Sequence, residues 1–248
     1  MKIGMTSLTF RSHSIEEVIR IAKIAEIDGI EWGVREGHAF SDENIDKIRL
    51  LSAKEGIEIF SLGSYCRMTD DEECKKTVDM AVRLSAPVIR VWAGKKSPWD
   101  CSEEEFEAIV DRTRKMADYA GKFGITLGFE YHRYSLTETA ESAVRLAKAI
   151  DRENVRLYWQ IDERADYEQN LKNLQMVMPY LAGVIHLQNY SAEGKCLLLE
   201  PISDELEGYL KLFKETDVKV LIEFVKDGLE ENFYQDVAVV KRIMERNA

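Results

Sequence analysis

The chain has 248 residues, of which 45% are hydrophobic and 32% are charged, with a formal net charge of −11. This composition is typical of a globular protein with a sizeable core, and the acidic balance argues against nucleic acid as a partner. No stretch approaches the roughly 18 consecutive apolar residues that a membrane span needs. The first predicted strand begins at Lys2, which leaves no room for a secretory leader, so we expect a cytoplasmic protein.

The four cysteines are widely and irregularly spaced, with no CxxC pair. Reduced thiols are therefore the expectation, ahead of a disulfide framework or a zinc knuckle. The cysteines are Cys66, Cys74, Cys101 and Cys196.

Short apolar runs alternate with longer amphipathic stretches along the whole chain. The first amphipathic stretch opens with Ser14 three residues before Glu17, the arrangement of a capping box. The apolar runs predict strands at Lys2–Thr9, Gly29–Trp32, Glu58–Gly63, Val88–Trp92, Thr126–Glu130, Val155–Gln160, Val184–Leu187 and Lys219–Phe224. The amphipathic stretches predict helices around Ile15–Ala25, Ile45–Leu51, Val78–Leu84, Ile109–Phe123, Ala143–Ile150, Leu171–Met178, Leu206–Phe213 and Val237–Ile243.

A glycine stands between helix and strand in several of these units, and we interpret Gly29, Gly56, Gly124 and Gly183 as helix stops. Eight strand–helix units without a Pro/Gly/Ser-rich linker predict an α/β protein, a single (β/α)8 TIM barrel forming one domain over residues 1–248. An open doubly wound sheet is the alternative, but no GxGxxG turn follows the first strand.

Four predicted strands carry a polar residue at the carboxyl end, where strands of a parallel barrel are otherwise apolar. Since barrel enzymes place their chemistry at this end, we expect the four side chains to converge on one site. Their donor set, two carboxylates, an amide and an imidazole, suits one divalent metal ion: Mn²⁺, Mg²⁺, Co²⁺ or Zn²⁺. Taken singly, each residue has a plainer structural interpretation, so the joint pattern carries the prediction. The residues are Glu130, Gln160, His186 and Glu223.

Further polar and aromatic residues end or follow the predicted strands on the same side. They could contact a substrate, although packing or loop exposure would explain each of them too. These substrate-binding candidates are Trp32, His38, Tyr65, Arg67, Trp92 and His132.

Short motifs in the same order along the whole chain resemble the xylose isomerase-like TIM barrels. The sugar phosphate isomerase/epimerase branch, which includes ketose 3-epimerases, inosose isomerases and dehydratases, is the most similar. The motifs are Ile30-Glu31-Trp32, Gly63-Ser64-Tyr65, Ile89-Arg90-Val91-Trp92-Ala93-Gly94, Phe129-Glu130-Tyr131-His132, Tyr158-Trp159-Gln160, Ile185-His186-Leu187 and Ile222-Glu223-Phe224-Val225.

The resemblance implies one divalent metal bound by Glu, Asp, His and Glu from strands five to eight, with the two glutamates as the catalytic acid–base pair. Glu130, His186 and Glu223 match these positions. Strand six differs from the family pattern, because Gln160 replaces the usual Asp and Glu163 stands where a His is often found. Asp162 is the alternative ligand: it has the same strand parity but would lie roughly 6–7 Å further along an extended strand.

The resemblance implies a metal-dependent isomerase or epimerase that acts on a sugar, sugar phosphate or cyclitol. It would abstract a proton next to a carbonyl and form an enediolate. The expected partner is this small molecule, with a homo-oligomer left open. The alternatives are a lyase, as in inosose- or dehydroshikimate-type dehydratases, and a degenerate carbohydrate-binding barrel without turnover. Apurinic endonuclease relatives need a histidine-rich multi-zinc site, which four histidines and a net charge of −11 do not favour.

Overall fold

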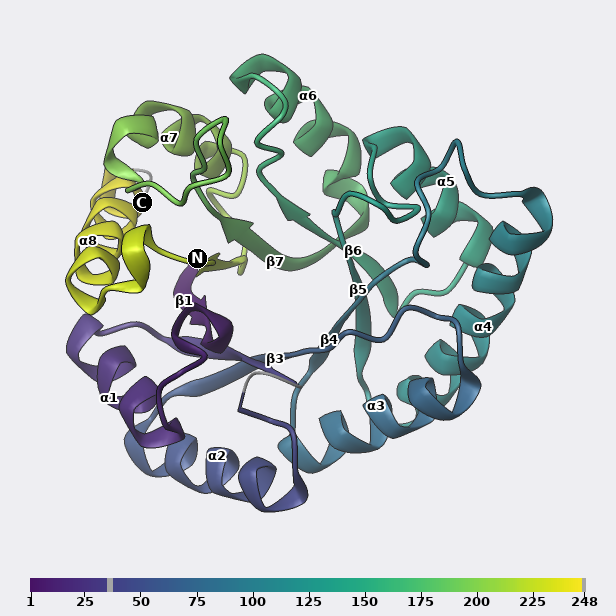
Figure 1. The fold of residues 1–248 in the computed structure, drawn as a ribbon, viewed down its shortest axis with the longest axis horizontal. Helices are drawn as coiled ribbons and strands as arrows, with labels where there is room; N and C mark the ends of the chain where they lie inside the picture. The colour runs from purple at the N-terminus through teal and green to yellow at the C-terminus, as the bar shows by residue number, and fades with distance from the viewer. Residues whose placement is uncertain (35–37, 247–248) are drawn as a thin grey trace. The chain divides into compact units, whose positions relative to one another are not determined.

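A computed structural model of the chain describes residues 1–34 and 38–246. Its eight parallel strands form a closed barrel in chain order, which confirms the predicted (β/α)8 TIM barrel (Figure 1). The strands are β1 Lys2–Thr6, β2 Gly29–Gly33, β3 Glu58–Gly63, β4 Val88–Val91, β5 Thr126–Glu130, β6 Val155–Gln160, β7 Leu181–Leu187 and β8 Lys219–Ile222. The helices are α1 Ile15–Ala25, α2 Asp42–Glu55, α3 Asp71–Leu84, α4 Glu103–Gly121, α5 Ala140–Ile150, α6 Tyr167–Val177, α7 Ser203–Lys211 and α8 Glu230–Arg246.

The predicted start of α1 is confirmed by its capping box. Ser14 Oγ accepts a hydrogen bond from the Glu17 backbone at 3.2 Å, and Glu17 accepts one from the Ser14 backbone at 2.7 Å. These reciprocal bonds satisfy two backbone donors that would otherwise lack a helical partner.

Several predicted strand ends shift by a few residues. Strand β1 stops at Thr6 rather than Thr9, because Ser7–Phe10 form a 3-10 turn in which Thr6 Oγ1 accepts from Leu8 N. Strand β8 stops at Ile222, so Glu223 lies just beyond it, held by a 3.0 Å bond from its backbone N–H to Leu187 O.

The glycine interpretation is correct for Gly56, which ends α2 with φ of 68°, and wrong for Gly29 and Gly183. Helix α1 is ended by Glu26, which adopts the left-handed conformation itself with φ of 52°. Gly29 lies inside β2, where an added Cβ would meet the Phe60 ring at 2.5 Å, so close packing explains this glycine. Gly183 lies inside β7.

The chain's contacts fall into two compact units. The first comprises Met1–Phe60, Gln160–Lys172 and Gly183–Ala248, and the second comprises Ser61–Trp159 and Asn173–Ala182. In the first unit, β1 pairs with both β2 and β8, and β8 pairs with β7. In the second, β4 pairs with β3 and β5, and α3 packs beside α4 (Figure 1). A single domain over residues 1–248 stays a prediction.

Among the described residues, no helix combines the length and the apolar character required to cross a membrane.

Candidate active site

In the first unit, the imidazole of His186 lies between two buried carboxylates. His186 Nδ1 is 3.2 Å from Glu223 Oε2, and His186 Nε2 is 3.7 Å from Glu31 Oε1. His186 comes from β7, Glu31 from β2, and Glu223 from the residue after β8, and all three are buried. Burial lowers the pKa of His186, but the two carboxylates outweigh it and raise the pKa to about 10. A divalent cation that binds one of these ring nitrogens would displace the proton, because an imidazole binds a metal in its neutral form.

In the second unit, Glu130 at the end of β5 forms an ion pair with Arg90 of β4. Both side chains are almost completely buried, so each charge depends on the other for compensation. The parallel register sets Arg90 beside Gly128, where an added Cβ would meet the Tyr158 ring at 2.5 Å. The hydroxyl of Thr137 donates to the Glu130 carbonyl oxygen and fixes the backbone at this strand end.

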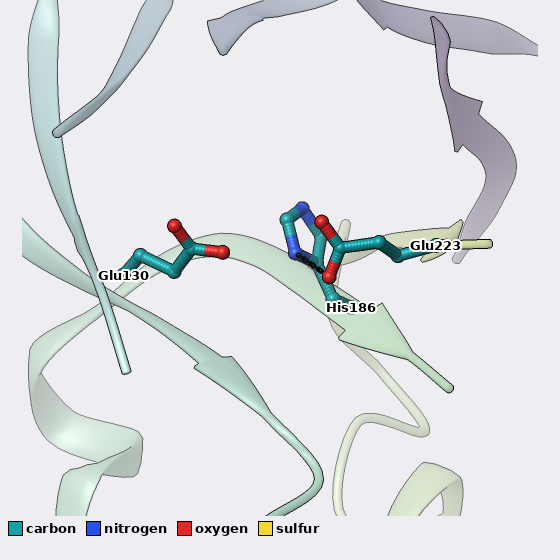
Figure 2. A group of neighbouring side chains, drawn as sticks. All are labelled: Glu130, His186 and Glu223. Carbon is teal, nitrogen blue, oxygen red and sulfur yellow. Dashed lines mark ion pairs between the residues drawn. The ribbon is translucent and has the colours of Figure 1, made fainter. Parts of the chain in front are cut away.

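The side chains of Glu130, His186 and Glu223 each offer one ligand atom, and these three atoms lie within 4.8 Å of one another. Figure 2 shows the Glu130 carboxylate directed toward the His186–Glu223 pair. Two carboxylates and one imidazole are a donor set that suits a divalent cation.

The two candidates on strand six have different surroundings. The buried Gln160 Oε1 has no hydrogen-bond partner in the part of the chain that the structure describes. The Asp162 carboxylate instead accepts hydrogen bonds from Arg164 Nε at 2.8 Å and Arg164 Nη2 at 2.9 Å. The free acceptor at this strand end is thus an amide oxygen, while the nearby carboxylate is paired with a guanidinium.

Four of the substrate-binding candidates form one cluster in the second unit. The rings of Trp92 and His132 are stacked with centroids 4.1 Å apart, and the Arg67 guanidinium lies 3.9 Å from the Trp92 centroid. The ring of Tyr65 is tilted against Trp92 at 6.0 Å. Trp92 Nε1 is buried and lacks a hydrogen-bond partner among residues 1–34 and 38–246. We call Tyr65, Arg67, Trp92 and His132 the aromatic cluster.

The other two substrate-binding candidates lie in packed surroundings. Trp32 has no exposed surface and, as the residue after Glu31 along β2, points to the opposite face of the strand. His38 is also buried, with Nε2 2.8 Å from the His13 carbonyl oxygen and its ring against the Trp32 edge. Both side chains are packed against each other, apart from the aromatic rings and guanidinium described above.

Two site residues were not assigned from the sequence. Glu31 lies within a motif of the sequence but was given no role there, yet a carboxylate within an apolar strand is itself a signal that it has a buried partner. Arg90 lies within the short strand β4, and the same reasoning applies to it.

The chain is similar to known proteins in both sequence and structure. The chain is 23% identical over 216 residues to a 3-dehydroshikimate dehydratase of Bacillus anthracis, covering 81% of this chain and 76% of that protein. It superposes on the structure of the probable 3-DHS dehydratase AsbF of Bacillus anthracis with a TM-score of 0.80 and 18% identity, covering 97% and 99% of the two chains.

Two further structures share the fold. A D-psicose 3-epimerase matches with a TM-score of 0.72 and 17% identity over 98% of this chain and 99% of that one. A Mycobacterium smegmatis protein in complex with magnesium matches with a TM-score of 0.68 and 16% identity over 100% and 98%. Residues 19–195 match the model of one family. This chain belongs to the xylose isomerase-like TIM barrel family.

Proposed function

We propose that this protein is a metal-dependent isomerase or epimerase that moves a proton on a carbon next to a carbonyl. Its substrate would be a sugar, a sugar phosphate or a cyclitol. The observation that carries the proposal is the grouping of Glu130, His186 and Glu223, with ligand atoms within 4.8 Å of one another. Two carboxylates supply the acid and base that such a reaction requires, and a D-psicose 3-epimerase and an L-ribulose 3-epimerase share the fold of this chain.

The proposed metal ligands are Glu130, His186 and Glu223, with Gln160 as the fourth. No group among the described residues donates to the buried Oε1 of Gln160, which supports this, since a buried amide oxygen without a donor is costly unless a ligand satisfies it. The donor set fits Mn²⁺, Mg²⁺, Co²⁺ or Zn²⁺. A bound divalent cation would act as a Lewis acid and stabilise the negative charge that develops on the substrate carbonyl oxygen.

The residues of the chain would handle the proton themselves. One carboxylate of the Glu130–Glu223 pair accepts the proton from carbon, and the other returns a proton to the opposite face or to the neighbouring carbon. The first outcome is epimerisation and the second is isomerisation. Arg90 holds Glu130 in place through their buried ion pair, and Glu31 positions His186.

The aromatic cluster is the proposed substrate-binding surface. The Trp92 ring is covered by the His132 ring at 4.1 Å and the Arg67 guanidinium at 3.9 Å, so a sugar or cyclitol would meet the outer edge of the cluster, where His132 and Arg67 supply hydrogen-bond donors. Trp32 and His38 are left out of this surface because both are packed elsewhere.

A dehydratase is the second candidate, supported by the similarity to the Bacillus anthracis 3-dehydroshikimate dehydratase. The first step would be the same proton abstraction. Dehydration and isomerisation or epimerisation differ in the next step. A dehydratase expels a β-hydroxyl group as water, whereas an isomerase or epimerase returns the proton to carbon.

The test is to incubate the protein, loaded in turn with each divalent metal, with ketoses, inososes, sugar phosphates and 3-dehydroshikimate in D₂O. An isomerase or epimerase incorporates deuterium at carbon, seen by NMR, whereas a dehydratase yields a product lighter by one water. We expect Glu130→Gln and Glu223→Gln each to abolish the reaction while the protein stays folded by circular dichroism.

Exchange retained in both variants would show that the proton is handled elsewhere. Binding of a sugar without exchange or dehydration would instead identify a carbohydrate-binding barrel without turnover. The matched control is Glu215→Gln, an exposed glutamate between α7 and β8.

A further inference from the structure

Two cysteine thiols lie in direct contact beside the aromatic cluster. Cys66 Sγ is 3.3 Å from Cys74 Sγ, and their residues are only 1% and 3% exposed. Cys66 belongs to the loop after β3, and Cys74 lies in the first turns of α3. Since a disulfide bond requires the sulfurs to approach to about 2.05 Å, a small movement of the loop toward the helix would allow it to form.

We propose that Cys66 and Cys74 are a redox modification site, at which hydrogen peroxide forms an intramolecular disulfide that disturbs the neighbouring aromatic cluster. Formation of the bond is independent of the proposed function, whereas its effect on turnover rests on that function.

The two thiols differ in reactivity. The hydrogen bond from Cys74 lowers the pKa of Cys66 more than burial raises it, while the same contact and burial raise the pKa of Cys74. Cys66 is therefore the attacking sulfur and Cys74 the resolving one, because the thiolate is the nucleophile. The other two thiols, Cys101 and Cys196, are half-buried, and the pKa of each is raised by burial.

The reaction balances with one peroxide. The Cys66 thiolate attacks one peroxide oxygen, the O–O bond breaks, and the leaving hydroxide takes up a proton to become water. The Cys74 sulfur then attacks the Cys66 sulfenic sulfur, the S–O bond breaks, and the hydroxyl leaves as a second water. The two thiols lose two electrons and two protons in total, and hydrogen peroxide is reduced to two waters.

A cavity of about 300 Å³ reaches Met68, a residue in contact with the pair. Met68 lines this cavity, and Met68 Sδ is 3.8 Å from Cys74 Sγ. A cavity of this size admits peroxide, whereas the low exposure of both thiols excludes a bulky disulfide reagent. We therefore expect peroxide to oxidise the folded protein at this pair, and the aromatic disulfide of Ellman's reagent to react there only after unfolding.

The cysteine pair is connected to the aromatic cluster by the chain itself and by backbone hydrogen bonds. Cys66 lies between Tyr65 and Arg67, and its carbonyl oxygen accepts a 2.8 Å bond from Trp92 N. Arg67 is held in the same way by a 3.0 Å bond from Gly94 N. Movement of Cys66 toward α3 would pull on these bonds and shift Arg67 and Tyr65 relative to Trp92.

The first experiment is peptide mapping of the peroxide-treated, non-reduced protein by mass spectrometry. We expect the peptides containing Cys66 and Cys74 to be linked, with a loss of two hydrogens that dithiothreitol reverses. This readout requires no activity, so it stands even if the proposed function fails. The proposal is overturned if Cys66 and Cys74 stay reduced, or form sulfinic acids without a cross-link.

The second experiment measures turnover of a substrate identified in the D₂O panel. Peroxide should raise KM severalfold with a smaller change in kcat, and dithiothreitol should restore KM. In Cys74→Ser, where no disulfide can form at this site, KM should not respond to peroxide in this way, whereas the control Cys101→Ser should respond like the wild type. An equal and irreversible loss in all three proteins would assign the effect to another oxidation and refute the coupling.

Discussion

Glu31 Oε1 lies 3.7 Å from His186 Nε2, and both side chains are almost completely buried. The other ring nitrogen, Nδ1, faces Glu223 at 3.2 Å. An imidazole that binds a metal through one nitrogen commonly donates from the other nitrogen to a carboxylate, which fixes the ring and makes it a better donor. Glu31 occupies the position of that carboxylate.

The change Glu31→Gln removes this charge while keeping the side-chain size. We expect it to weaken divalent-metal binding by roughly 10-fold to 100-fold, the usual effect of losing a partner behind a metal-binding histidine. Isothermal titration with Mn²⁺ would measure the change, with Glu215→Gln as the exposed control. Equal affinities for the wild type and Glu31→Gln would show that Glu31 plays no part in metal binding.

The strand-six ligand is tested by a pair of changes. Gln160→Asp adds a third negative charge to the proposed ligand set and should tighten Mn²⁺ binding. Asp162→Asn should leave it nearly unchanged, because that carboxylate is already engaged by Arg164. Isothermal titration of the two variants with Mn²⁺ decides whether Gln160 or Asp162 is the ligand. Loss of affinity in Asp162→Asn, with no gain in Gln160→Asp, would make Asp162 the ligand.

The buried ion pair between Arg90 and Glu130 is tested by removing the cation. Arg90→Met should destabilise the fold by about 3–5 kcal/mol, because it leaves a buried carboxylate without its partner. Urea unfolding gives the difference, and the added change Glu130→Gln should recover part of the loss. The control Arg152→Met breaks the exposed pair with Asp118 and should cost less than about 1 kcal/mol. A similar loss in the free energy of unfolding for Arg90→Met and Arg152→Met would show that the buried pair contributes no more to stability than the exposed one.

The pH dependence of stability should contain a contribution from Asp236 on α8. Its buried carboxyl accepts a 2.8 Å hydrogen bond from Leu199 N, and burial raises its pKa to about 6. Because the folded state binds this proton more tightly than the unfolded state, stability falls as pH rises from about 4 to about 6. The loss amounts to ~3 kcal/mol and persists at neutral pH.

Asp236→Asn keeps an acceptor for Leu199 N but cannot ionise. We expect this variant to be more stable than the wild type at pH 7, and the two proteins to converge near pH 4. Urea midpoints measured across this range provide the check. Parallel curves for the two proteins would mean that Asp236 ionises in the folded state as it does in the unfolded one.

The sequence by itself determined the local structure and the polar ends of the strands. Capping pairs such as Ser14 with Glu17 and the alternation of apolar residues act over a few residues, so they can be recognised without the rest of the chain. Because parallel strands align their carboxyl ends, Glu130, Gln160, His186 and Glu223 could be selected before the fold was known.

Only the tertiary structure decided which side chains became partners. Glu31 meets His186, and Arg90 meets Glu130, across strands that are far apart in the sequence. Trp32 and His38 had the right positions in the sequence for a substrate site, but folding buried both in packing contacts. Strand alternation predicts that Glu31 and Trp32 point in opposite directions. Which of the two faces the polar site depends on the strands and helices that pack on each side, and a sequence pattern within one strand carries no information about them.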